Sequence, residues 1–253
     1  MSNPHLPPEI LDYVIDLLRD EPETLRRCCL VSRSWVPRTR RHLFANIKFS
    51  SASDLRSWKK AFPDVSNSPA YHAHTLLIRP RLVTASDAEE GGWIRAFSGV
   101  VSLVVDSGTQ NFRPSEASLA PFFKFSPSLN SLRIRHIVLP FPQVFDLIPS
   151  SPLLEDLGLK GRNESRFNED DPYRPQTVVS PTSPVFTGTL EFHILGGAGN
   201  AARRLMDLPN GLHFRNLALT WDCKEDHWWI TELVAKCSHT LQSLDITCLF
   251  RRM

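Results

Sequence analysis

One apolar pattern recurs along most of this 253-residue chain. In each copy, a mostly apolar residue is followed three positions later by a leucine and two positions after that by another apolar residue. The copies begin at Ala73, Val100, Leu129, Leu154, Thr187, Phe214 and Leu241. Their central leucines are Leu76, Leu103, Leu132, Leu157, Leu190, Leu217 and Leu244, at spacings of 27, 29, 25, 33, 27 and 27 residues. Repetition at a period of about 20 to 50 residues is typical of chains built from stacked structural units.

Each copy predicts a short strand, because alternate residues of a strand point to opposite faces. The pattern resembles the leucine-rich repeat, which implies an α/β solenoid of parallel strands joined by returning helices or loops. The consensus asparagine after each strand is mostly absent, so these repeats are divergent. The alternative is an unrelated α/β domain in which the same segments are ordinary buried strands.

The segments between the copies also carry structural signals. Helix-like apolar segments lie at 142–149, 201–208 and 228–237. The longest spacing contains residues 161–186, whose polar, acidic and proline-rich composition predicts a flexible loop. Its Ser180-Pro181 and Ser183-Pro184 pairs are possible phosphorylation sites, although such pairs are common in loops. No polar capping segment is evident after the last copy, where a stacked array normally needs one.

The first 44 residues predict three short helices. Pro7-Pro8 suits the start of the first helix, because proline has the helical φ and lacks an N–H group that the first turn cannot use. The apolar stripe of this helix comprises Ile10, Leu11, Val14, Ile15, Leu17 and Leu18. A second helix is expected from near Glu23, and a third from Ser32 or Ser34 toward Phe44. Helices this short need packing against one another to be stable.

The residue order in this region resembles the F-box. The opening Leu6-Pro-Pro-Glu-Ile10, the middle Cys29-Leu-Val-Ser-Arg-Ser-Trp35 and the closing Leu43-Phe44 follow the order and spacing of that family. Phe44 replaces the commoner closing tryptophan, and the turn at 20–24 is acidic and somewhat extended. The resemblance covers residues 6 to about 49. It predicts an F-box at 1–49, followed by the repeat domain at 50–253.

The F-box resemblance implies binding to a Skp-type adaptor and, through it, to a cullin ubiquitin ligase. The implied adaptor-binding residues are Leu6, Pro7, Ile10, Leu11, Leu30, Val31, Ser32 and Trp35. A few aliphatic and aromatic side chains supply most of the affinity of such interfaces. The same residues could also form the core of the three helices. Because so small a segment cannot cover all of its own apolar surface, some of these residues are expected both to form the core and to bind the adaptor.

The repeat domain would then hold an unknown target protein on the strand face that the leucines do not occupy. The target-binding residues suggested by the alternation are Arg133, Arg135, Glu155, Asp156, Glu191 and Asp245. Such a chain is expected to catalyse no reaction and to need no cofactor. It would act by raising the effective concentration of a target beside a partner enzyme. The alternative is an interaction scaffold that acts outside ubiquitin ligation.

Composition favours a cytoplasmic or nuclear protein. The net charge of +2 is too small to indicate nucleic-acid binding, and no apolar run approaches the roughly 18 residues of a membrane helix. The N-terminus lacks the basic and apolar segments of a secretory signal. Five cysteines without a Cys-x-x-Cys motif indicate reduced thiols. Cys28 and Cys29 do not suggest a metal site, because helical neighbours point about 100° apart and only His42 follows within 20 residues.

Two further motifs suggest other functions. Residues 197–202 fit Gly-x-Gly-x-x-Ala between two expected strands, and Asp222 follows twenty residues later, as in a dinucleotide-binding fingerprint. A glycine-rich turn between a repeat strand and its helix is the simpler interpretation. At His227-Trp228-Trp229, one tryptophan is expected in the core and the other at the surface, where it could anchor a target. No histidine pattern with metal spacing and no Gly-x-Ser-x-Gly nucleophile motif is present.

Overall fold

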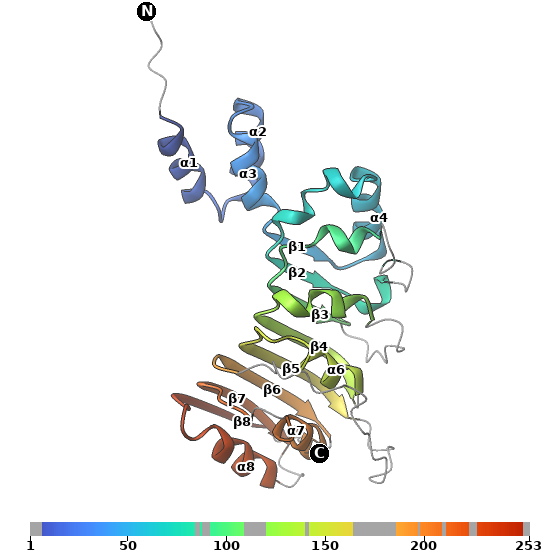
Figure 1. Cartoon of the computed structure of the whole chain (residues 1–253), viewed down its shortest axis with the longest axis vertical. Helices are drawn as coiled ribbons and strands as arrows, with labels where there is room; N and C mark the ends of the chain where they lie inside the picture. The colour runs from blue at the N-terminus through green and yellow to red at the C-terminus, as the bar shows by residue number, and fades with distance from the viewer. Residues whose placement is uncertain are drawn as a thin grey trace, which may run out of the picture.

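The chain is an α/β protein with an all-parallel sheet of eight strands, which confirms the predicted fold class at that level (Figure 1). The computed structural model describes residues 7–83, 87, 92–108, 120–139, 142–163, 186–196, 198–208, 211–222 and 227–249. The strands are β1 (Asn46–Phe49), β2 (Thr75–Ile78), β3 (Ser102–Asp106), β4 (Ser131–Leu139), β5 (Asp156–Asn163), β6 (Thr189–Leu195), β7 (Asn216–Asp222) and β8 (Ser243–Leu249). They lie in the sheet in chain order, so each strand pairs only with its neighbours in sequence.

The seven repeated leucines lie side by side across the sheet. Leu76 on β2 pairs with Leu103 on β3, and the register continues through Leu132, Leu157, Leu190, Leu217 and Leu244. The copy beginning at Ala73 is therefore a member of the series. We call this row the leucine row. From Leu76 to Leu217 its side chains are at most 1% exposed.

The repeat pattern predicted seven strands and missed β1. Ile47 of β1 pairs with Leu76, and the residues around it, Phe44, Ile47 and Phe49, follow the same three-then-two spacing. This strand lies inside the predicted 1–49 segment and pairs directly with β2. The division of the chain at residue 49 remains a prediction.

Helical segments connect the strands. The α-helices are α4 (Ala52–Ala61), α6 (Pro142–Leu147), α7 (Ala198–Met206) and α8 (Trp228–Cys237), and the last three coincide with the apolar segments identified in the sequence. The 3-10 helices are η1 (Val65–Asn67), η2 (Pro69–His72), η3 (Pro80–Leu82), η5 (Trp93–Ala96) and η6 (Ala120–Ser128). Buried side chains of α7 and α8, such as Leu205 and Trp229, belong to the same core as the leucine row. The core therefore lies between one face of the sheet and the connecting segments.

Part of the predicted loop belongs to a strand. Residues 161–163 form the end of β5, and Phe186 is buried in the core. The rest of the predicted loop, with both Ser-Pro pairs, lies outside the described residues, as do residues 250–253.

The outer strand β8 presents its apolar residues to solvent. Leu244 and Ile246 are each 44% exposed, whereas their register partners Leu217 and Leu219 on β7 are 1% exposed. Within the described residues, no further element covers this end of the leucine row. The two ends of the sheet therefore differ, because helices precede β1 at the other end (Figure 1).

Three helices precede the sheet: α1 (Pro8–Leu17), α2 (Pro22–Val31) and α3 (Val36–Leu43). Each carries a proline at one of its first two positions, as the sequence predicted for the first helix. Aromatic packing joins this region to the sheet. The ring of Trp58 on α4 lies 5.9 Å from that of Phe44 and 5.7 Å from that of Phe49, both in edge-to-face geometry. The end of α3 and the first strand are thereby fixed to one another.

Candidate functional site

The first helix carries an exposed apolar stripe. Ile10, Tyr13, Val14 and Leu17 follow the i, i+3, i+4, i+7 spacing of one helix face and are 48%, 63%, 42% and 66% exposed. On another side of the same helix, Ile15 is 1% exposed. α1 therefore packs through one narrow contact and leaves its broader apolar face to solvent.

The end of the second helix is exposed as well. Leu30 and Val31 are the last two residues of α2, and their side chains are 87% and 67% exposed. Among the described large apolar side chains, Leu30 is the most exposed. Leu25 and Cys28 occupy the packed side of α2 and are buried. We call Ile10, Tyr13, Val14, Leu17, Leu30 and Val31 the helical apolar residues.

The described residues implied by the F-box resemblance lie in two different environments. Pro7, Ile10, Leu30 and Val31 are exposed, whereas Leu11, Ser32 and Trp35 are half-buried. Leu6 lies outside the described residues. Val14 and Leu17 were part of the apolar stripe seen in the sequence but were not selected as binding residues, and Tyr13 was overlooked. A hydrophobicity plot at helical spacing that counted tyrosine as apolar would have included it.

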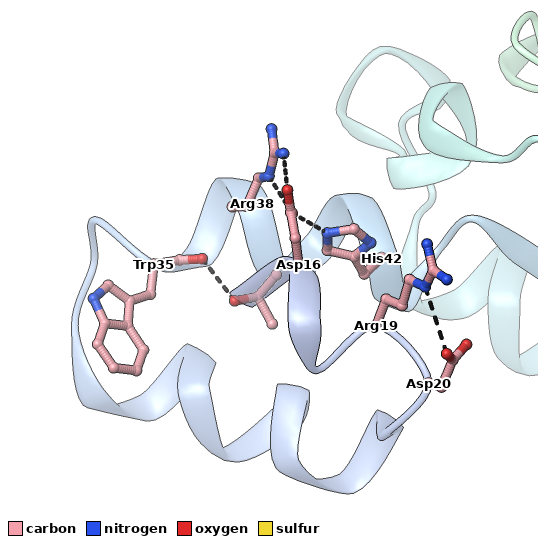
Figure 2. A network of polar contacts seen from close by, with 7 residues as sticks. Asp16, Arg19, Asp20, Trp35, Arg38 and His42 are labelled. Carbon is pink, nitrogen blue, oxygen red and sulfur yellow. Dashed lines mark hydrogen bonds and ion pairs between the residues drawn. The ribbon is translucent and has the colours of Figure 1, made fainter. Parts of the chain in front are cut away.

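An ion-pair network joins α1 to α3 (Figure 2). Arg38 donates from Nε to Asp16 Oδ1 at 2.7 Å and from Nη2 to Asp16 Oδ2, and His42 Nε2 lies 2.7 Å from Asp16 Oδ1. The hydrogen bonds from Arg38 hold the pKa of the Asp16 carboxyl well below its usual range, and they raise the pKa of Arg38. Asp16 is thus an anchor that sets how α1 lies on α3.

The turn that carries Trp35 is fixed by hydrogen bonds to the backbone. The Thr39 hydroxyl donates to the Trp35 carbonyl at 2.7 Å (Figure 2), and the Ser34 amide donates to Ser32 Oγ at 3.3 Å. Thr39 itself is fully buried. These bonds define the path of the chain between Val31 and α3.

The second candidate site lies on the sheet face opposite the leucine row. Arg133 on β4, Gly158 on β5 and Glu191 on β6 are register partners. Arg133 Nη2 reaches across β5 to Glu191 Oε1 at 3.1 Å, a path that is open because Gly158 has no side chain. A Cβ at residue 158 would lie 2.9 Å from Arg133 Cγ. The charges of Arg133 and Glu191 therefore offset one another.

The other predicted target-binding residues are not all equivalent. Arg135 alternates with core residues on β4, whereas Asp245 lies between Leu244 and Ile246 on β8, whose side chains are exposed. Asp156 accepts a hydrogen bond from the Thr189 amide at 2.7 Å, which ties it to the start of β6. Glu155 precedes β5 and lies outside the strand pattern. The alternation thus places five of the six residues on one face but does not reveal which of them already have partners.

A β-bulge shapes this face. The pairing of β4 with β5 shifts between Arg135 and Ile137, and His136 between them has a φ of 55°. This left-handed conformation is uncommon for a residue other than glycine. The His136 carbonyl accepts a hydrogen bond from Ser107, and its Nδ1 lies 2.9 Å from Asp106 Oδ1. Bulges re-aim side chains, and here neighbouring Arg135 and His136 line the same cavity.

Two adjoining cavities lie beside the bulge. The first has a volume of about 250 Å³ and is lined by Arg135, His136, Gly158, Leu159, Lys160, Glu191 and His193. The second, of about 460 Å³, shares His136, Lys160 and His193 and adds Gly161, Arg162, Leu195, Thr220 and Leu249. We call them the basic pocket and the mixed pocket. Burial lowers the pKa of His193, whose Nδ1 is hydrogen-bonded to the Thr220 hydroxyl.

The chain matches no family model, no curated protein and no solved structure.

Three sequence features are accounted for by packing. In the glycine-rich segment, a Cβ on Gly199 would lie 3.1 Å from the indole of Trp228, so close helix packing explains that glycine, and Gly197 lies outside the described residues. Trp229 is buried and Trp228 is 38% exposed, as expected for adjacent helical residues. Cys28 is buried and Cys29 half-buried. Among the described residues, no group of three or more His, Cys, Asp or Glu side chains could hold a metal ion.

None of the described helices combines the length and the apolar character needed to cross a bilayer.

Proposed function

We propose that this chain is the target-recognition subunit of a Skp–cullin–F-box ubiquitin ligase. In this proposal residues 1–49 are an F-box that binds a Skp-type adaptor, and the remaining residues form a divergent leucine-rich-repeat solenoid that binds a target protein. The chain catalyses no reaction and brings the target close to a partner enzyme.

One observation carries the adaptor proposal. Leu30 and Val31, in the middle of the F-box-like motif, are 87% and 67% exposed at the end of α2. Exposed apolar patches of this kind mark protein-binding surfaces, because covering them releases ordered water. The stripe on α1 adds four more apolar side chains, of which Ile10 belongs to the opening of the motif.

The solenoid part of the proposal is supported by the register of the sheet. Seven leucines at near-regular spacing occupy one row, and every strand pairs with its sequence neighbours. That arrangement is what stacked repeat units produce, since each unit buries its apolar face against the next one.

A binding measurement with a purified Skp-type adaptor tests the proposal. The double variant Leu30→Ala/Val31→Ala is expected to weaken adaptor binding at least about tenfold, because truncating central apolar anchors costs more than about 1 kcal/mol. Leu153→Ala is the matched control: Leu153 is 57% exposed and lies outside the three helices. Equal binding by the double variant and the control would refute the proposed surface.

A scaffold that binds the adaptor outside ubiquitin ligation is the second candidate, since the same surface would serve it. Reconstitution with purified adaptor and cullin distinguishes the two. A stable ternary assembly supports the ligase subunit, whereas adaptor binding that excludes the cullin supports the scaffold.

A further inference from the structure

We propose that the basic and mixed pockets together bind an extended peptide segment that carries a carboxylate side chain beside an apolar one. This inference specifies the chemistry of the target within the proposed function.

The basic pocket contains two cations that form no ion pair within the described residues. Among the described residues, the side chains of Arg135 and Lys160 form no ion pair and no hydrogen bond. The neighbouring acids are engaged, because Glu191 is bonded to Arg133 and Asp106 to His136. An anionic group entering the pocket would therefore meet two cations that form no ion pair, and it could form charge-assisted hydrogen bonds with them.

The bulge concentrates these groups at one place. In a regular strand, Arg135 and His136 would point to opposite faces of the sheet. The left-handed backbone of His136 brings both side chains to the same cavity, and the hydrogen bonds from Ser107 and to Asp106 hold that conformation. Backbone strain held in this way is found at ligand sites more often than elsewhere.

The charge balance favours a single negative charge over a phosphate group. Glu191 and Asp245 interact electrostatically with His193, and Asp106 lies beside His136. Burial lowers the pKa of His193 and so disfavours the charged form of its ring. The two cations of the basic pocket are flanked by carboxylates and match one carboxylate better than a dianion, whose second charge would face repulsion from those acids. The third cation of the site, Arg162, lies in the mixed pocket.

The mixed pocket supplies the apolar half of the site. Leu195 and Leu249 line it, and Leu249 is 37% exposed at the outer strand. It shares His136, Lys160 and His193 with the basic pocket, so both halves are within reach of one short segment. Their volumes of about 250 and 460 Å³ suit one acidic and one larger apolar side chain with adjoining backbone.

Selection from a displayed library of random nonapeptides on the intact purified chain tests this inference. We expect enriched peptides to carry Asp or Glu within three positions of Leu, Ile, Val or Phe. Against an enriched peptide made synthetically, Lys160→Gln and Arg135→Gln should each bind about tenfold more weakly, the loss expected for one charge-assisted hydrogen bond. The matched control Lys48→Gln removes an exposed cation from β1 and should bind like the unmodified chain.

Three outcomes would overturn the inference. The first is enrichment without an acidic preference, and the second is binding that neither pocket substitution changes. The third is tighter binding when phosphoserine replaces the acidic residue, which would assign the site to phosphate. Adaptor binding, measured on the same protein samples, separates the two proposals. Loss of peptide selection with intact adaptor binding defeats only this inference, and the reverse result defeats only the adaptor proposal.

Discussion

The three N-terminal helices and the sheet use the same residue type in opposite ways. Leu132 on β4 is fully buried between its register partners Leu103 and Leu157, whereas Leu30 on α2 is 87% exposed. A strand inside the sheet has neighbours on both sides and connecting segments over one face. A ten-residue helix buries only one narrow side. Apolar periodicity therefore marks buried core positions in the sheet and exposed side chains in the helices, where the proposed function places an association surface.

The largest effect on stability is expected from Leu132→Ala. Removing a fully buried leucine from the middle of the leucine row loses apolar burial and leaves a cavity, at a cost of roughly 2–5 kcal/mol. Denaturant unfolding followed by circular dichroism measures the loss. A change below about 1 kcal/mol would mean that the row can collapse around the gap and that the sheet is less tightly packed than its burial implies.

Gly158→Ala should have the next largest effect. The new Cβ would lie 2.9 Å from Arg133 Cγ, so the Arg133 side chain must move and its contact with Glu191 is disturbed. We expect a loss of about 1–3 kcal/mol, the usual cost of overpacking. In the background of Arg133→Ala the clash is absent and the same substitution should cost much less. Equal costs in both backgrounds would contradict this explanation.

Asp16→Asn should have a smaller effect, which depends on pH. Its carboxylate is about one-third exposed, so the loss of its contacts with Arg38 and His42 is expected to cost at most about 1 kcal/mol at pH 7. Because folding lowers the pKa of Asp16, its contribution is complete above the ordinary value near 4 and declines as the pH falls below it. Unfolding curves of both proteins at several pH values should therefore converge in acid. A constant difference would exclude the ionised network as the cause.

The smallest effect on stability is expected from Leu30→Ala. The side chain is 87% exposed, so the free energy of unfolding should change by no more than about 0.5 kcal/mol. Thermal unfolding of this variant beside Leu132→Ala compares the two regions directly. A large loss at Leu30 would show that the exposed residue supports the fold, and the distinction between helices and sheet would fail.

The strand positions could be predicted because their cause is local. Each copy of the repeat alternates core and outer residues, and the sheet register preserves the spacing that the sequence displays. β1 was missed because Phe44, Ile47 and Phe49 contain no leucine and lie within a segment already assigned to a helical motif. The other seven strands carry a leucine at the central position, whereas β1 carries Ile47 there.

The chemistry of the pockets could not be predicted from spacing alone. The Arg133–Glu191 contact joins strands that are 58 residues apart, and it depends on a missing side chain on the strand between them. The left-handed backbone of His136 depends on hydrogen bonds with Ser107 and Asp106, about 30 residues earlier. The ion pair and the bulge conformation both depend on contacts between distant segments, so a local sequence pattern cannot predict them.

The exposed apolar residues of β8 indicate that the sheet unfolds first at this outer strand. Within the described residues, β8 pairs only with β7, so Leu244 and Ile246 have a neighbouring strand on one side. Because the strands pair in chain order, detachment of β8 would leave the pairing of β1 to β7 unchanged. A pulling force applied between β1 and β8 is carried by each strand pair in turn. The molecule should yield from β8 inward, in steps, while the aromatic contacts around Trp58 hold the helical end together.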